Sequence, residues 1–167
     1  MMQNTTTAFL CLGSNIRPRR NIRFAVQRLQ QDFDSVVVSN VYKSTAVGFD
    51  GDDFLNLAIA LKTQYSLGEL LRYTDGLEKE AGRIRVCRGN YDSRTLEVDV
   101  VMFGNLTGEH KGRQWPSEDI QDNAHVLLPM SEIAGDRKHP ALGVNFSRLW
   151  KEFDAPGQRL KQVEQTW

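Results

Sequence analysis

Apolar residues recur along this chain at two different spacings, and each spacing predicts a different element. Residues 18–33 repeat apolar side chains every three or four positions, which predicts an amphipathic helix with Pro18 in its first turn. Residues 67–81 repeat the same spacing. Ser66 precedes that run and Glu69 follows three residues later, which is the pattern of a capping box at a helix start. Two helices are therefore expected in the first half of the chain.

Strands are predicted where short runs are apolar throughout or alternate between apolar and polar positions, with many β-branched residues. Four stretches fit this description, at residues 8–12, 35–43, 54–63 and 96–103. The resulting order is β-α-β-β-α-β. We expect an α+β fold, a ferredoxin-like sandwich with a four-stranded sheet that contains antiparallel pairs and carries both helices on one face. Each helix crossover should join strands that can be parallel neighbours.

The rest of the chain is less regular. Residues 104–125 are polar and predict a loop, whereas residues 129–134 and 146–153 predict short helices. The length of 167 residues fits one domain, because typical domains contain ~100–150 residues. We expect a single domain over residues 1–167.

Alternation along the last strand separates its side chains into two sets. Glu97 and Asp99 fall on the same face, roughly 6–7 Å apart along the strand. The same alternation over residues 54–61 places Phe54 and Asn56 on that face as well. We expect the other set to pack against the helices: Leu96, Val98, Val100 and Met102. Val101 and Phe103 should lie on the same face as the two acids.

Two carboxylates at this spacing suit Mg²⁺, which takes oxygen ligands and often binds one or two carboxylates together with substrate phosphates. The pattern alone fits an ordinary solvated strand face better, since acidic residues are mostly exposed. The neighbouring sequence changes this balance, because guanidinium groups match phosphate oxygens. Four arginines stand just upstream, at Arg83, Arg85, Arg88 and Arg94. A solvated basic loop is the alternative for them. No Walker A sequence is present, which excludes a P-loop NTPase.

Charge and cysteine content restrict the possible partners. Twenty-one basic residues balance twenty-one acidic ones, so a general electrostatic footprint for nucleic acid is absent. No apolar run approaches the ~18 residues of a membrane span, and the first residues lack the basic region of a signal peptide. Cys11 and Cys87 are too few for a disulfide framework. We expect a cytoplasmic monomer without a nucleic-acid or membrane partner.

Several short segments carry a family resemblance that covers about 130 residues. Leu12-Gly13-Ser14-Asn15 stands near the start, and the others occur at residues 41–44, 54–56, 80–85, 94–99, 128–134 and 139–143. In this order they resemble the 6-hydroxymethyl-7,8-dihydropterin pyrophosphokinases of folate biosynthesis, whose fold is ferredoxin-like. The resemblance implies transfer of diphosphate from ATP to the hydroxymethyl oxygen of the pterin, with release of AMP.

The resemblance also assigns roles to individual residues. Two Mg²⁺ ions are expected on Glu97 and Asp99, which with Arg83 and Arg94 form the catalytic set. The pterin should be bound by Ser44, Thr45, Val47, Phe54, Asn56, Tyr91 and His125. ATP should be bound by Glu78, Arg83, Arg85, Arg88 and Ser117. ATP and a reduced pterin are thus the expected partners.

Some positions depart from the family pattern. Glu97 stands in place of an aspartate, and Ser117 replaces a histidine that helps to bind ATP phosphate. Asn123-Ala124-His125 replaces an Arg-x-Phe segment, in which the arginine belongs to the catalytic site and the aromatic ring sandwiches the pterin. Two alternatives follow, a paralogue that acts on another pterin and a non-catalytic protein that binds pterin or nucleotide. A ferredoxin-like RNA-binding module is a third alternative, although its open face would carry stacking aromatics rather than acids.

Overall fold

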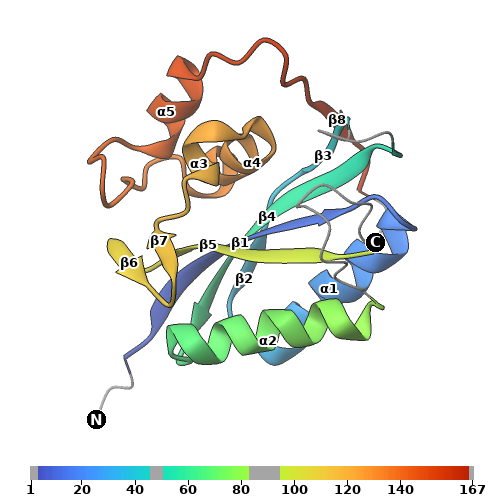
Figure 1. Ribbon diagram of the computed structural model, residues 1–167, viewed down its shortest axis with the longest axis horizontal. Coiled ribbons are helices and arrows are strands. Elements are labelled where there is room, and N and C mark those ends of the chain that lie inside the picture. Colours follow the sequence, from blue (N-terminus) through green and yellow to red (C-terminus); the bar gives the residue numbers. More distant parts are fainter. Residues whose placement is uncertain (1–3, 46–50, 83–94, 166–167) are drawn as a thin grey trace.

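A computed structural model describes residues 4–45, 51–82 and 95–165 of the chain (Figure 1). The strands are β1 (Thr6–Ser14), β2 (Val36–Val38), β3 (Val41–Ser44), β4 (Phe54–Thr63), β5 (Glu97–Phe103), β6 (Gly108–His110), β7 (Arg113–Trp115) and β8 (Lys161–Val163). The helices are α1 (Pro18–Asp32), α2 (Leu67–Glu80), α3 (Asp119–Asp122), α4 (Ala124–Ala134) and α5 (Phe146–Glu152). No described helix is long and apolar enough to cross a membrane.

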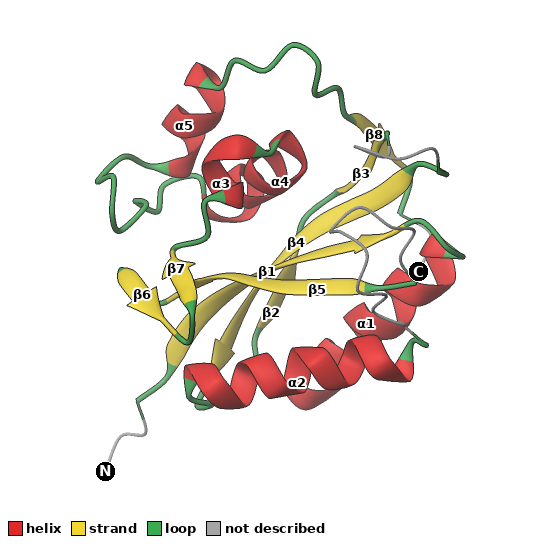
Figure 2. Cartoon of the chain, viewed as in Figure 1, coloured by secondary structure: helices red, strands yellow, loops and turns green. Residues whose placement is uncertain are grey.

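The main sheet has the strand order β5-β1-β4-β3-β8, and β2 also pairs with β4 (Figure 2). All of its pairings are antiparallel. The strands that each helix joins are therefore not parallel neighbours, and that expectation was wrong. Strand β4 lies between β1 and β3, and β1 lies between β4 and β5. This interleaving is the ferredoxin-like arrangement that the element order predicts.

Helices α1 and α2 cover one face of the sheet, as predicted (Figure 2). The capping box at the start of α2 is present, because Ser66 Oγ accepts from the Glu69 N–H at 3.3 Å and Glu69 Oε2 accepts from the Ser66 N–H at 2.7 Å. The apolar stripes of both helices meet the inward side chains of β1, β4 and β5 in a first core cluster. Its helical members include Ile22, Ala25, Val26, Leu29, Leu67, Leu70 and Leu77.

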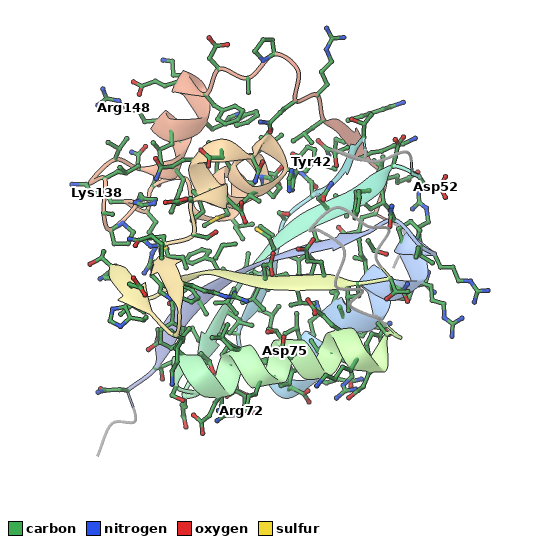
Figure 3. All side chains as sticks on the ribbon, viewed as in Figure 1. Tyr42, Asp52, Arg72, Asp75, Lys138 and Arg148 are labelled. Atoms are coloured by element: carbon green, nitrogen blue, oxygen red, sulfur yellow. The ribbon has the colours of Figure 1, made fainter. Side chains whose placement is uncertain are left out.

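The other face of the sheet is partly covered by α4 and α5, which the β-α-β-β-α-β order does not contain (Figure 1). They enclose a second core cluster with Phe9, Ala58 and Met102. Tyr42 of β3 ties this layer to the sheet, because its hydroxyl donates to a Glu132 carboxylate oxygen of α4 (Figure 3). The ferredoxin-like core therefore has a helical layer on each face.

Several predicted boundaries in the second half of the chain were wrong. The expected loop at residues 104–125 contains the β6–β7 hairpin and α3. Helix α4 begins at Ala124 rather than at residue 129, so Pro129 lies inside it. Strand β8 was not predicted, since its three residues carry no clear periodic signal.

The expected strand at residues 35–43 is divided into β2 and β3. Ser39, which is 2% exposed, lies at the division. Its hydroxyl accepts from the Ala58 N–H at 2.9 Å and donates to the Asn40 carbonyl at 2.8 Å. A side chain thus replaces a ladder hydrogen bond where the two strands separate.

A register shift in β5 reverses the alternation near its end. Phe9 pairs with Met102 and Leu10 pairs with Val100, so Val101 is an extra residue on β5. Beyond it, Met102 packs in the second cluster and Phe103 packs against the first, which is the opposite of the expected placement. A β-bulge has this effect because one unpaired residue inverts the sidedness of all that follow.

Candidate active site

The register of three adjacent strands brings the predicted polar residues together. Gly13 of β1 pairs with Asn56 of β4 on one side and with Glu97 of β5 on the other. Two residues earlier on β1, Cys11 pairs with Asp99 in the same way. The expectation that Asn56, Glu97 and Asp99 share one face is confirmed by this register.

Gly13 has no side chain, which leaves space between Asn56 and Glu97. A Cβ atom at this position would lie 3.4 Å from Asn56 Oδ1 and 3.9 Å from Glu97 Oε2. Any side chain larger than a methyl group would fill the space between the amide and the carboxylate. Glycine therefore leaves room for a small molecule to approach both groups.

Asp99 and Glu97 interact directly. Burial, the charge and hydrogen bond of Glu97 and the charge of Glu78 together raise the pKa of Asp99 to about 8, and Arg113 opposes this rise. Near neutral pH the Asp99 carboxyl therefore holds a proton, because a buried carboxylate beside another acid resists ionisation. A divalent cation would offset the repulsion between the two carboxylates. Their oxygen atoms fit Mg²⁺, because the coordination shell of Mg²⁺ is usually completed by substrate phosphates and water rather than by further protein ligands. Among the described residues, no group of three or more His, Cys, Asp or Glu side chains could hold a metal.

Asn56 is held in one orientation by β3. Its Nδ2 donates to Ser44 Oγ at 2.8 Å and to the Tyr42 carbonyl at 3.3 Å. The Oδ1 atom is the one nearest the Gly13 backbone, so the acceptor of the amide remains directed along the row. A ligand with N–H donors could be recognised there.

A cavity of about 810 Å³ lies over this row, between the sheet and the second helical layer. Eight of the predicted site residues line it, from five separate parts of the chain: Ser44, Thr45, Phe54, Asn56, Glu97, Asp99, Ser117 and His125. A volume of this size accommodates a drug-sized ligand.

Of the remaining predicted residues, the structure describes Glu78, which is not part of this lining. Glu78 is 3% exposed, and its Oε1 accepts from the Val98 N–H at 2.9 Å, which places it under β5 rather than in the cavity. Glu78, which was expected to bind ATP, is therefore not one of the residues that line the cavity. The other six lie outside the described residues: Val47, Arg83, Arg85, Arg88, Tyr91 and Arg94.

Sequence reasoning missed other residues that line the cavity. Arg113 and Gln114 come from β7, within the stretch expected to be a loop. Gln158 and Arg159 come from the segment between α5 and β8. The Lys111-Gly112 pair, which turns the hairpin, is the one local signal that could have located Arg113.

Comparison with known proteins identifies the family of this chain. The family model for 7,8-dihydro-6-hydroxymethylpterin-pyrophosphokinase (HPPK) matches residues 9–135. A 2-amino-4-hydroxy-6-hydroxymethyldihydropteridine pyrophosphokinase from Haemophilus influenzae is 31% identical over 151 residues, covering 88% of this chain and 92% of the relative. The protein of the same name from Bacillus subtilis is 33% identical over 153 residues, covering 87% and 90%.

Solved structures agree at the level of the fold. A crystal structure of Plasmodium falciparum HPPK-DHPS superimposes with a TM-score of 0.72 at 13% identity. The match covers 90% of this chain but 42% of the other, so this chain spans less than half the length of that protein. With the family match over most of the chain and two relatives that are more than 30% identical, this chain belongs to the 7,8-dihydro-6-hydroxymethylpterin-pyrophosphokinase family.

Proposed function

We propose that this protein transfers diphosphate from ATP to the hydroxymethyl group of 6-hydroxymethyl-7,8-dihydropterin. The hydroxymethyl oxygen forms a bond to the β-phosphorus of ATP and loses its proton to solvent. The bond between that phosphorus and the α,β-bridging oxygen breaks, and AMP leaves with the bridging oxygen. The reaction class is a diphosphoryl transfer, for which an enzyme mainly positions and neutralises its substrates.

One observation carries this proposal. The directed amide of Asn56 and the carboxylate pair of Glu97 and Asp99 lie in one row of the sheet and line one cavity. A heterocycle rich in N–H groups would bind at the amide end, against Phe54 and near His125. Its hydroxymethyl group would then be directed toward the carboxylates, where the ATP phosphates would lie.

Mg²⁺ would be held by Glu97 and Asp99. When bound, it would neutralise charge on the phosphate oxygens and orient them. The protein's own contribution is to keep both carboxylates at the metal and to hold the pterin against Asn56 through Ser44 and Tyr42. Glu97 replaces the usual aspartate and retains the oxygen donor, although its carboxylate is one methylene further from the strand.

Measurement of AMP release tests the proposal. Purified protein is incubated with ATP and Mg²⁺, with and without 6-hydroxymethyl-7,8-dihydropterin, and a panel of other reduced pterins is assayed in parallel. AMP formation that requires the hydroxymethyl pterin is the expected result. Turnover with a different pterin alone would replace the proposed substrate. Binding of pterin or ATP by folded protein without AMP formation would support a non-catalytic binding protein instead.

A further inference from the structure

The cavity has an unfavourable charge for a polyphosphate, at least over the residues that the structure describes. Its described lining contains four carboxylates and two guanidinium groups, from Glu97, Asp99, Glu118, Asp119, Arg113 and Arg159. A triphosphate placed there would be repelled by the acids unless cations contacted it directly. Mg²⁺ would offset part of this repulsion. Among the described lining residues, Arg113 and Arg159 are the side chains whose charge is opposite to that of the phosphates.

Arg113 is held by the β6–β7 hairpin. Lys111 and Gly112 both have positive φ, at 54° and 71°, and form a two-residue turn that pairs His110 with Arg113. Trp115 is 1% exposed, and its Nε1–H donates to the His110 carbonyl at 2.9 Å, which fixes the hairpin on the core. Arg113 is exposed and lines the cavity, and its charge lowers the pKa of Asp99.

Arg159 is held by the segment that connects α5 to β8. Its neighbour Gln158 accepts from the Ala124 N–H and donates to the Asp122 carbonyl, both at 2.8 Å. These two bonds flank Asn123 at the start of α4 and fasten the segment to the rim of the cavity. Three residues further on, Lys161 pairs with Lys43 in the sheet. Arg159 is thus presented from backbone that is fixed on both sides.

We propose that Arg113 and Arg159 bind the phosphates of the nucleotide, as a cation pair supplied by two segments outside the ferredoxin-like core. This inference rests on the proposed function. Guanidinium groups suit the role because their planar forks donate two hydrogen bonds to one phosphate. The two segments differ in sequence position by more than forty residues, so only the folded chain brings the arginines to one cavity.

Nucleotide binding by single-alanine variants tests the inference. Arg113→Ala and Arg159→Ala should each weaken binding of Mg²⁺ with a non-transferable ATP analogue by about tenfold to a hundredfold, the usual effect of one lost charge-assisted contact. Arg148→Ala is the matched control, since Arg148 is exposed on α5, is paired with Glu152 and does not line the cavity (Figure 3). Its binding should equal that of wild type.

Comparison of the ATP analogue with adenosine, a nucleoside without phosphate, separates phosphate contact from a structural role. The loss should be large for the ATP analogue and small for adenosine, and the unfolding temperature of each variant should equal that of wild type. Arg113→Lys and Arg159→Lys should recover part of the affinity because they retain the charge without the fork. A general distortion of the cavity would weaken adenosine equally.

The role of Gln158 can be measured in a double-mutant cycle. Gln158→Ala should weaken binding of the ATP analogue in the wild-type background but have little further effect with Arg159→Ala, because Gln158 acts through Arg159. Wild-type protein that fails to bind the analogue would overturn the proposed function. Wild-type protein that binds it, together with arginine variants that bind within twofold of wild type, would overturn this inference alone.

Discussion

The same strands contribute side chains to both faces of the central sheet, and the two faces differ in composition and in role. On the face covered by α1 and α2, the inward side chains are apolar and most members of the cluster are fully buried. On the other face, apolar residues under α4 and α5 give way to Asn56, Glu97 and Asp99 around a cavity. Consecutive residues of β5 therefore belong to different environments, since Val98 packs in the first cluster while its neighbours line the cavity.

This difference separates stability from chemistry. Dense apolar packing on the first face supplies burial energy, at roughly 25 cal/mol per Å² of apolar surface. The second face retains groups that are costly in the absence of a ligand, such as the Asp99–Glu97 pair. A protein can keep such a pair when the opposite face of the same strands provides the stability. Substitutions on the two faces should consequently have different signatures.

The largest effect is expected from Asp99→Ala. Loss of one of the two proposed metal-binding carboxylates should lower Mg²⁺-dependent turnover about a thousandfold or more, while the protein remains folded. Steady-state AMP release and a thermal unfolding scan measure the two properties. Asp136→Ala is the control, because this exposed aspartate is not part of the cavity lining. Wild-type rates in Asp99→Ala would refute the metal assignment.

Leu70→Ala should have the converse signature. Leu70 is fully buried in the first cluster, and Leu→Ala substitutions at such positions cost about 2–5 kcal/mol of unfolding free energy. The turnover number of the folded fraction should not change. Leu142→Ala removes the same atoms from a side chain that is 43% exposed, and it should cost about 0.5 kcal/mol or less. Equal losses in the two variants would contradict the proposed role of the first face.

The pH dependence of stability provides a separate test of the cavity face, through the titration of Asp99. The pKa of Asp99 in the folded state is about 8, against 3.8 as the ordinary value. Between these values the folded protein holds a proton that the unfolded chain has lost, so stability from this group is complete at the acid end and declines toward pH 8.

Thermal unfolding of wild type and Asp99→Asn across this range measures the effect. Without divalent cations, the unfolding temperature of wild type should fall relative to that of Asp99→Asn as the pH rises. Added Mg²⁺ should restore wild type and leave Asp99→Asn unaffected. Parallel pH profiles for the two proteins would show that the carboxylate pair is not strained.

The smallest effect is expected from Ser66→Ala on the first face. Removal of the hydroxyl that caps α2 should cost about 1 kcal/mol in denaturant unfolding, with no change in turnover. Ser66→Asp keeps an acceptor at the cap and should retain most of the stability. If Ser66→Ala reduced AMP release as strongly as it reduced stability, the two faces would not be independent.

Local periodicity was sufficient for the first face. The stripe of α1, the capping box of α2 and the alternation of β4 each act within a few residues, so their signals can be seen in the sequence. Periodicity failed at Met102 and Phe103, because a bulge depends on how β5 pairs with β1. It also failed for β8, whose strand structure depends on pairing with the edge strand β3.

For the candidate site, the sequence by itself determined the chemistry of the row: Asn56, Glu97 and Asp99 were identified from two-residue alternation on strands whose partners were not yet known. The tertiary structure alone decided that Gly13 lies between the amide and the carboxylate, and that Arg113 and Arg159 reach the same cavity. The physical reason is the separation along the chain of the residues that determine each feature. Alternation is fixed by local backbone geometry, whereas a cavity is formed by strand register and loop closure between residues distant in the chain.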